Sequence, residues 1–147
     1  MDENIELVRE LNGVKYFCNH NGNTPDQTVA LLEALNQKVI LIAAGYEDKA
    51  SCDSLGNALV EKVKHLILFG QTTAMIEMSL MRKLVGKNQG IDIRITHCTT
   101  LKQAVDCAFL SSKPEDIVIL SAAGSCIDIY NDIEEMCEAY KQYTDEL

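Results

Sequence analysis

The sequence predicts an α/β fold: a Rossmann-like, doubly wound and mostly parallel sheet with an antiparallel hairpin at its N-terminus. Three observations lead to it. Residues 5–18 alternate around an Asn-Gly pair, four short and nearly continuous apolar runs follow, and segments of helical period separate those runs. Apolar runs of this kind are typical of parallel strands that helices cover on both faces.

The hairpin is predicted from Asn12-Gly13, which lies between Ile5–Leu11 and Val14–Cys18. Asn-Gly readily supplies the two positive φ angles of a type I′ turn, so these two runs should pair as antiparallel strands. The remaining strands are expected at Val39–Ala43, Leu66–Phe69, Ile91–Ile95 and Ile117–Leu120.

The first helix should begin after Thr24, because Thr at the N-cap, Pro at the first position and Gln27 at the third form a capping box. Its inward residues are Val29, Leu32 and Leu35.

Four further helices are expected, each with an apolar stripe at helical spacing. The second helix is capped by Asp53 and carries Leu55, Ala58, Leu59 and Val63, and the third spans Thr73 to Val85 and stops before Gly86. The fourth begins at Thr100-x-x-Gln103, with Leu101, Val105 and Ala108 facing inward. The fifth begins near Asn131, with Ile133, Met136, Cys137 and Tyr140 on one stripe.

We predict a single domain over residues 1–147, since no repeat, linker or low-complexity tract divides the chain. In open α/β sheets a ligand binds beyond the carboxyl ends of the strands. The loops expected there are 18–23, 44–52, 70–72, 97–99 and 121–131.

Composition and charge argue against several classes of protein. The net charge of −9 would repel nucleic acid. The sequence has no apolar run near the ~18 residues that a membrane span requires and no apolar signal segment, so we expect a cytoplasmic protein. The six cysteines form no C-x-x-C pair, and we predict reduced thiols rather than a disulfide framework.

Three of these loops are candidate binding segments, and each has a plain structural explanation as well. Residues 18–28 could hold an anion at a helix start, or form a tight polar loop. Residues 44–49 could offer Lys49 to an anionic group, or form a solvated turn. Residues 121–126 could be a wall of the crevice or a close-packed turn. Cys126 has no evident base that would make it a nucleophile.

Neither G-x-x-x-x-G-K-[ST] nor G-x-G-x-x-G occurs, so the chain carries no Walker loop and no dinucleotide fingerprint. His20, His65 and His97 lie too far apart in sequence for their spacing to indicate a metal site. His20 and His97 could both face the crevice.

Several blocks in unbroken order resemble the C-terminal domain of the Mur ligases, most closely the MurD type, the UDP-N-acetylmuramoyl-L-alanine:D-glutamate ligases. They are Leu7 to Tyr16, Pro25-Asp26-x-Thr28, Val39 to Tyr46, Asp116 to Ala123, and Glu134-Glu135.

The resemblance implies one part of a three-domain enzyme. The other two domains bind the UDP-sugar and ATP with Mg²⁺, and this one closes over the site and receives D-glutamate, whose amine attacks an activated carboxylate. This domain alone would hold no cofactor, no metal and no catalytic residue, and its partners would be the N-terminal and central domains. The substrate-binding residues that the resemblance implies are Asn19, Asn21, Asn23, Thr24, Asp48, Lys49, Ser121, Ser125 and Cys126.

The loop motifs depart from the family pattern. Residues 18–23 share hardly a letter with Asn-Asp-Ser-x-Ala-Thr, and Cys126 replaces a Ser. A gapless alignment sets Asp48 where Lys is expected, and Lys49 matches only with a one-residue shift. A carboxylate ligand needs positive or hydrogen-bonding donors, so these changes should weaken D-glutamate binding.

Two functions therefore remain open: the amino-acid-binding domain of a divergent ligase, or a degenerate, non-catalytic binding or interaction module. A flavodoxin-like or receiver-like domain would need an acidic cluster or a phosphate loop at the end of the first strand, and neither is present.

Overall fold

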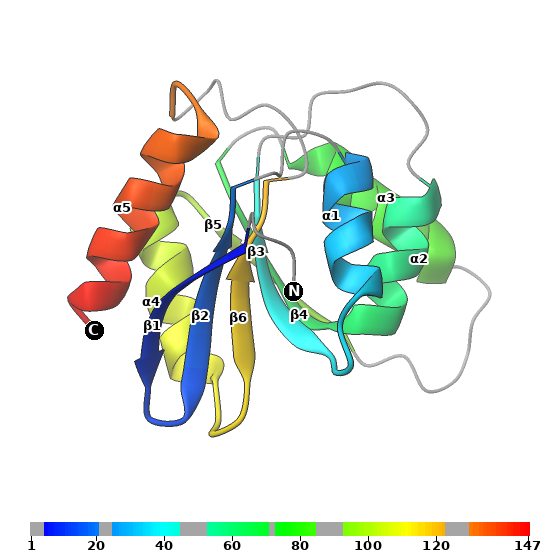
Figure 1. Cartoon of the computed structure of the whole chain (residues 1–147). Helices are drawn as coiled ribbons and strands as arrows, with labels where there is room; N and C mark the ends of the chain where they lie inside the picture. Colours follow the sequence, from blue (N-terminus) through cyan, green and yellow to red (C-terminus); the bar gives the residue numbers. More distant parts are fainter. Residues whose placement is uncertain (1–4, 21–24, 45–52, 71–72, 85–92, 123–129) are drawn as a thin grey trace.

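The computed structural model describes residues 5–20, 25–44, 53–70, 73–84, 93–122 and 130–147 (Figure 1). Within these ranges strands and helices alternate after an initial hairpin. The strands are β1 Ile5–Leu11, β2 Val14–Asn19, β3 Val39–Ala43, β4 Val63–Phe69, β5 Arg94–Cys98 and β6 Ile117–Leu120. The helices are α1 Pro25–Glu33, α2 Asp53–Lys62, α3 Ala74–Leu84, α4 Leu101–Ser111 and α5 Ile133–Asp145.

The strands form one sheet in the order β1-β2-β6-β3-β4-β5. Among the described strands, the β1–β2 pair is antiparallel and every other neighbouring pair is parallel. At the hairpin turn φ is 55° at Asn12 and 82° at Gly13, as a type I′ turn requires. The predicted fold class and hairpin are confirmed.

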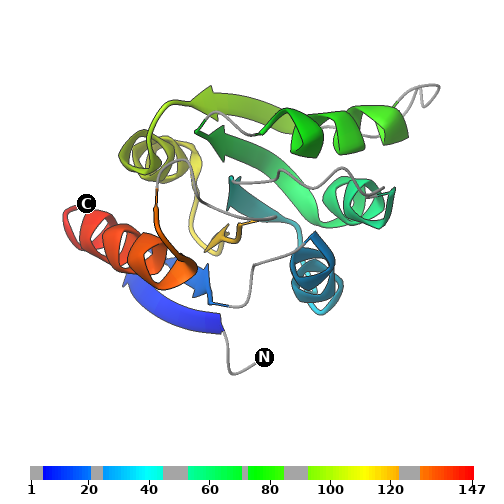
Figure 2. The same ribbon diagram turned by 90° about the horizontal axis from the view of Figure 1, so that it is seen from above.

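Helices cover both faces of the sheet, which makes a three-layer structure (Figures 1 and 2). Helices α4 and α5 lie on one face and α1, α2 and α3 on the other. Each face has its own apolar core: one includes Tyr16, Ile42 and Tyr140, the other Leu32, Leu41 and Leu59. Burial on both sides explains why β3 and β6 are nearly continuous apolar runs.

The five predicted helices are present, with changes at their ends. The predicted N-cap of the first helix, Thr24, lies outside the described residues, and Leu35 is buried but lies beyond the end of α1. Thr100 and Gln103 form the predicted capping box of α4. The predicted inward residues of α5 are all buried, and Asp132 caps that helix. Val63 is a correction: it begins β4 instead of ending α2, because the chain passes from helix to strand without a loop.

The strand predicted at Ile91–Ile95 is wrong in its position. The strand runs from Arg94 to Cys98 and lies at the edge of the sheet, where it pairs only with β4. An edge strand is half exposed and needs no continuous apolar run. The apolar run at Ile91–Ile95 therefore overlaps only the beginning of β5.

None of the described helices has the length and the apolar character needed to cross a lipid bilayer.

Candidate functional site

The carboxyl ends of β2, β6 and β3 lie side by side, as the sheet order requires. The backbone N–H of Ser121, directly after β6, donates to the carbonyl of Ile42 in β3 at 2.9 Å. The first turn of α1 reaches the same edge, because the Thr28 hydroxyl lies 2.9 Å from the Ser121 hydroxyl. The convergence of strand ends predicted from the sequence is therefore present.

A chain of hydrogen bonds joins these elements. Asn19 Nδ2 donates to Ser121 Oγ at 3.1 Å, and Thr28 Oγ1 donates to the carbonyl of Ala122 at 2.9 Å. A hydroxyl has one proton, and that of Thr28 goes to Ala122, so the Ser121 hydroxyl must donate to Thr28 Oγ1. The direction of every bond from Asn19 to Ala122 is thus determined. We call Asn19, Ser121 and Thr28 the polar relay.

The relay is buried. Asn19 is 2% exposed, and Ser121 and Thr28 are 0% exposed. Its hydroxyl groups donate to acceptors within the protein. In this arrangement the relay therefore fixes the ends of β2 and β6 against α1. Of the nine residues predicted to bind substrate, Asn19 and Ser121 are brought together here, and contact of either with a ligand stays a prediction.

The other seven predicted site residues lie outside the described residues. They are Asn21, Asn23, Thr24, Asp48, Lys49, Ser125 and Cys126. Their roles also stay predictions.

The prediction that all cysteines are reduced is wrong for one pair. Cys18 of β2 and Cys137 of α5 form a disulfide, with their Cα atoms 6.1 Å apart. They are 119 residues apart in the sequence, so local spacing could not reveal a pair that only the fold brings together. Cys98 and Cys107 are free thiols, and Cys52 and Cys126 lie outside the described residues.

His20 lies beside that disulfide, between two carboxylates. Its Nε2 is 2.8 Å from Glu6 Oε1 and its Nδ1 is 3.0 Å from Glu134 Oε1. Burial favours the neutral ring, but the hydrogen bonds and charges of the two carboxylates outweigh it and raise the pKa of His20. The hydrogen bond with His20 in turn lowers the pKa of Glu6 against the opposing effect of burial, and Lys141, 3.5 Å from Glu6, adds to that lowering.

The other two histidines do not join this group. His97 Nε2 is 2.9 Å from Glu77 Oε1 of α3. His65 is buried near the start of β4, and its Nε2 lies 2.8 Å from Thr96 Oγ1.

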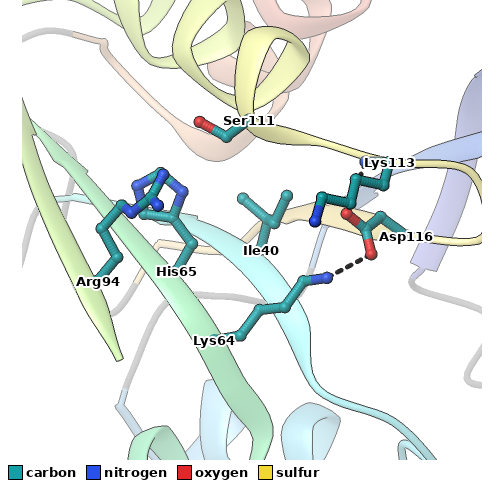
Figure 3. A pocket seen from close by; sticks show the side chains of 7 residues that line it. All are labelled: Ile40, Lys64, His65, Arg94, Ser111, Lys113 and Asp116. Carbon is teal, nitrogen blue, oxygen red and sulfur yellow. Dashed lines mark hydrogen bonds and ion pairs between the residues drawn. The ribbon is translucent and has the colours of Figure 1, made fainter. Parts of the chain in front are cut away.

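A cavity of about 300 Å³ lies at the opposite ends of the strands, around the amino ends of β3, β4 and β5 (Figure 3). Lys64 forms an ion pair with Asp116 there, which leaves Arg94 and Lys113 as the cavity's other cationic side chains. Burial, with a smaller effect of Arg94, lowers the pKa of His65. Because this cavity is remote from the carboxyl ends of the strands, it is no part of the predicted amino-acid site.

The sequence has no Walker loop, which is the segment that would hold the phosphates of ATP. The side chains of the polar relay are neutral and bonded to one another.

Comparison with known proteins identifies the fold. A protein-family profile described as "Mur ligase, glutamate ligase domain" matches residues 5–124. The chain belongs to this Mur ligase family. It corresponds to the C-terminal domain of the MurD type, and helix α5 follows the matched region.

The curated relatives of this Mur ligase domain agree with the profile. It is 41% identical over 142 residues to the UDP-N-acetylmuramoylalanine--D-glutamate ligase of Acetivibrio thermocellus, covering 97% of this chain and 30% of that protein. It is 36% identical over 147 residues to the ligase of that name from Ruminiclostridium cellulolyticum, covering 100% of this chain and 32% of that protein. The chain thus spans about a third of the length of these relatives.

Solved structures support the fold of the Mur ligase domain. The murein peptide ligase of Psychrobacter arcticus superimposes with a TM-score of 0.60 at 11% identity, covering 97% of this chain and 30% of that one. At this identity the likeness concerns the fold alone.

Three features of the site were not predicted from the sequence: the place of Thr28 in the relay, the Cys18–Cys137 bond, and the His20 cluster. One signal was available. Cys18 and His20 are two residues apart at a strand end, a spacing that directs side chains to the same face. Nothing in the sequence, however, paired that face with α5.

Proposed function

We propose that the chain is the D-glutamate-binding C-terminal domain of a MurD-type, ATP-dependent amide ligase of peptidoglycan synthesis, and that it has no catalytic activity alone. One observation carries the proposal: the similarity to proteins named as D-glutamate ligases extends over essentially the whole chain, at up to 41% identity. An N-terminal and a central domain of the same cytoplasmic enzyme would be its partners, and the central one would bind ATP and Mg²⁺.

Within this proposal the residues divide into two groups. Asn19 and Ser121 fix the carboxyl ends of β2 and β6 through the polar relay. Lys49 supplies positive charge to a carboxylate of D-glutamate, while the amides and hydroxyls of Asn21, Asn23, Thr24 and Ser125 offer hydrogen bonds. Asp48 and Cys126 lie in the same loops and set the charge and size of the site.

A chimeric enzyme tests the proposal. The chain would replace the corresponding C-terminal third of the Acetivibrio thermocellus ligase, and phosphate release would be measured with and without D-glutamate. We expect release that depends on D-glutamate and not on L-glutamate. The Lys49→Gln chimera should have a raised KM for D-glutamate, since the charged contact is removed, while Lys102→Gln, an exposed site on α4, serves as the matched control.

A degenerate, non-catalytic module is the second candidate. It is favoured by the polar relay, whose neutral side chains are bonded to one another and offer no charged donor to a carboxylate. This candidate predicts a folded chimera that releases no phosphate in response to D-glutamate. It also predicts that D-glutamate does not raise the unfolding free energy of the isolated chain, whereas a true ligand at 100 times its Kd adds about 2.7 kcal/mol.

A further inference from the structure

Sulfur, imidazole and carboxylate side chains meet where α5 crosses the β1–β2 hairpin. The sulfurs of Cys18 and Cys137 and a ring nitrogen of His20 all lie within 4.8 Å of one another. Glu6 and Glu134 each approach one of the two ring nitrogens of His20. No other group of three such ligands appears among the described residues.

The local structure explains why these side chains converge. Cys18 and His20 are two residues apart at the end of β2, so both point toward the face that α5 covers. Glu134 and Cys137 are three residues apart on α5, so they lie on the same side of the helix. Glu6 pairs directly with Cys18 across the antiparallel hairpin. Both elements therefore present their ligands to the same point.

We propose that the reduced chain binds one thiophilic divalent cation here, with zinc as the expected ion, through the thiolates of Cys18 and Cys137 and one ring nitrogen of His20. Thiolate and imidazole are the donors that zinc prefers in proteins. Two thiolates neutralise the charge of the ion. The second ring nitrogen of His20 would keep a carboxylate partner, the arrangement that orients histidine ligands in zinc sites.

The site and the disulfide exclude each other. A dithiol or phosphine reductant transfers two electrons to the Cys18–Cys137 bond, the S–S bond breaks, and two protons complete the thiols. Binding of the cation then releases those two protons, so the affinity should rise with pH. Cys18 is 0% exposed and Cys137 is 3% exposed in the disulfide-bonded structure, so both sulfurs lie away from bulk water.

The cation would take over the structural task of the disulfide. Cys18 immediately precedes Asn19, the first member of the polar relay. A link from Cys18 to α5, through sulfur or through zinc, therefore fixes the end of the strand on which the relay depends. A reducing environment, where disulfides are rare, is the condition in which zinc is needed.

Cobalt(II) substitution tests the proposal with the whole chain. Reduced protein would be titrated with Co²⁺ without oxygen, and thiolate-to-cobalt charge-transfer absorption would be recorded. We expect absorption that saturates at one equivalent and is lost on addition of one equivalent of Zn²⁺. The oxidised wild-type protein, with the same sequence and its disulfide intact, should give no such absorption.

Variants assign the ligands. Cys18→Ser with Cys137→Ser should abolish the absorption, and His20→Gln should weaken cobalt binding by about 10-fold or more. Cys98→Ser with Cys107→Ser removes two thiols outside the cluster and should change nothing. Absence of the absorption from reduced wild-type protein, whether it stays folded by circular dichroism or not, would overturn the proposal. So would its persistence in the Cys18 and Cys137 double variant, which would place the cation on other thiols.

Discussion

Thr28 is the central residue of the polar relay, because its hydroxyl accepts a hydrogen bond from Ser121 and donates one to the backbone carbonyl of Ala122. Thr28→Val keeps the shape of the side chain and removes both bonds. The carbonyl of Ala122 then loses this buried partner, and such a loss costs about 1–3 kcal/mol. We expect the free energy of unfolding in urea to fall by that amount.

Thr144→Val is the matched control for this substitution. Thr144 is also 0% exposed, but its hydroxyl donates to the carbonyl of Lys141 within α5, a bond that helices do not require. Its effect should be smaller than that of Thr28→Val. Equal losses in the two variants would contradict a special role for the relay.

His65 makes stability depend on pH. Burial and, to a lesser extent, Arg94 lower its pKa in the folded state, so the unfolded chain binds this proton more readily. Stability must then be lost as the pH falls through the unfolded value near ~6.5 toward the lower folded value. Wild-type protein should lose more unfolding free energy than His65→Gln between about pH 8 and about pH 5.5.

The size of that loss can be traced to its causes. Arg94→Gln removes the smaller cause and leaves burial, so its pH-dependent loss should lie between those of wild type and His65→Gln. Parallel stability curves for wild type and His65→Gln would contradict this assignment.

Strands and helices that are buried, or that carry a local capping signal, could be predicted most accurately from the sequence. β3 and β6 were predicted with their observed bounds, because strands covered on both faces have an unmistakable apolar pattern. The capping box of α4 was found because its signal lies within four residues. β5 was misplaced because Arg94 and His97 are exposed at the sheet edge, where apolar patterning carries little information.

Helices α2 and α3 pack closely at Gly56. A Cβ on Gly56 would lie 2.3 Å from the carbonyl oxygen of Ser79, a backbone atom that cannot rotate away. Ala favours helices over Gly by about 1 kcal/mol, but overpacking costs about 1–3 kcal/mol and here requires the helices to separate. Gly56→Ala should therefore lower the unfolding free energy.

Asn57→Ala provides the comparison in the neighbouring, exposed position of α2. It should raise stability slightly through helix propensity alone. Stabilisation by both substitutions, measured by urea unfolding, would show that α2 and α3 adapt to the added methyl group.

For the molecule as a whole, topology decides what the sequence could and could not reveal about the site. The meeting of the β2 and β6 ends followed from the predicted sheet, and the Asn19–Ser121 bond lies there. The position of α5 over the hairpin could not be foreseen, because an amphipathic helix reveals which face it buries but not the surface it covers. The Cys18–Cys137 bond and the His20 cluster both depend on that position.

The Cys18–Cys137 disulfide should stabilise the whole domain. It closes a loop of 119 residues between the second strand and the last helix, so it restricts most of the unfolded chain. Loss of a disulfide commonly costs about 2–5 kcal/mol, more for long loops, and we expect a loss in this range when Cys18 and Cys137 are both replaced by Ala.

Guanidinium unfolding of the oxidised protein would measure this loss, with the Cys98→Ser, Cys107→Ser protein as a control that keeps the bond. Because the cross-link joins the two ends of the fold, its removal should also increase hydrogen exchange in α5 and the β1–β2 hairpin more than in β3 and β4. Uniform acceleration over the whole sheet would mean that α5 and the hairpin open only when the entire domain unfolds.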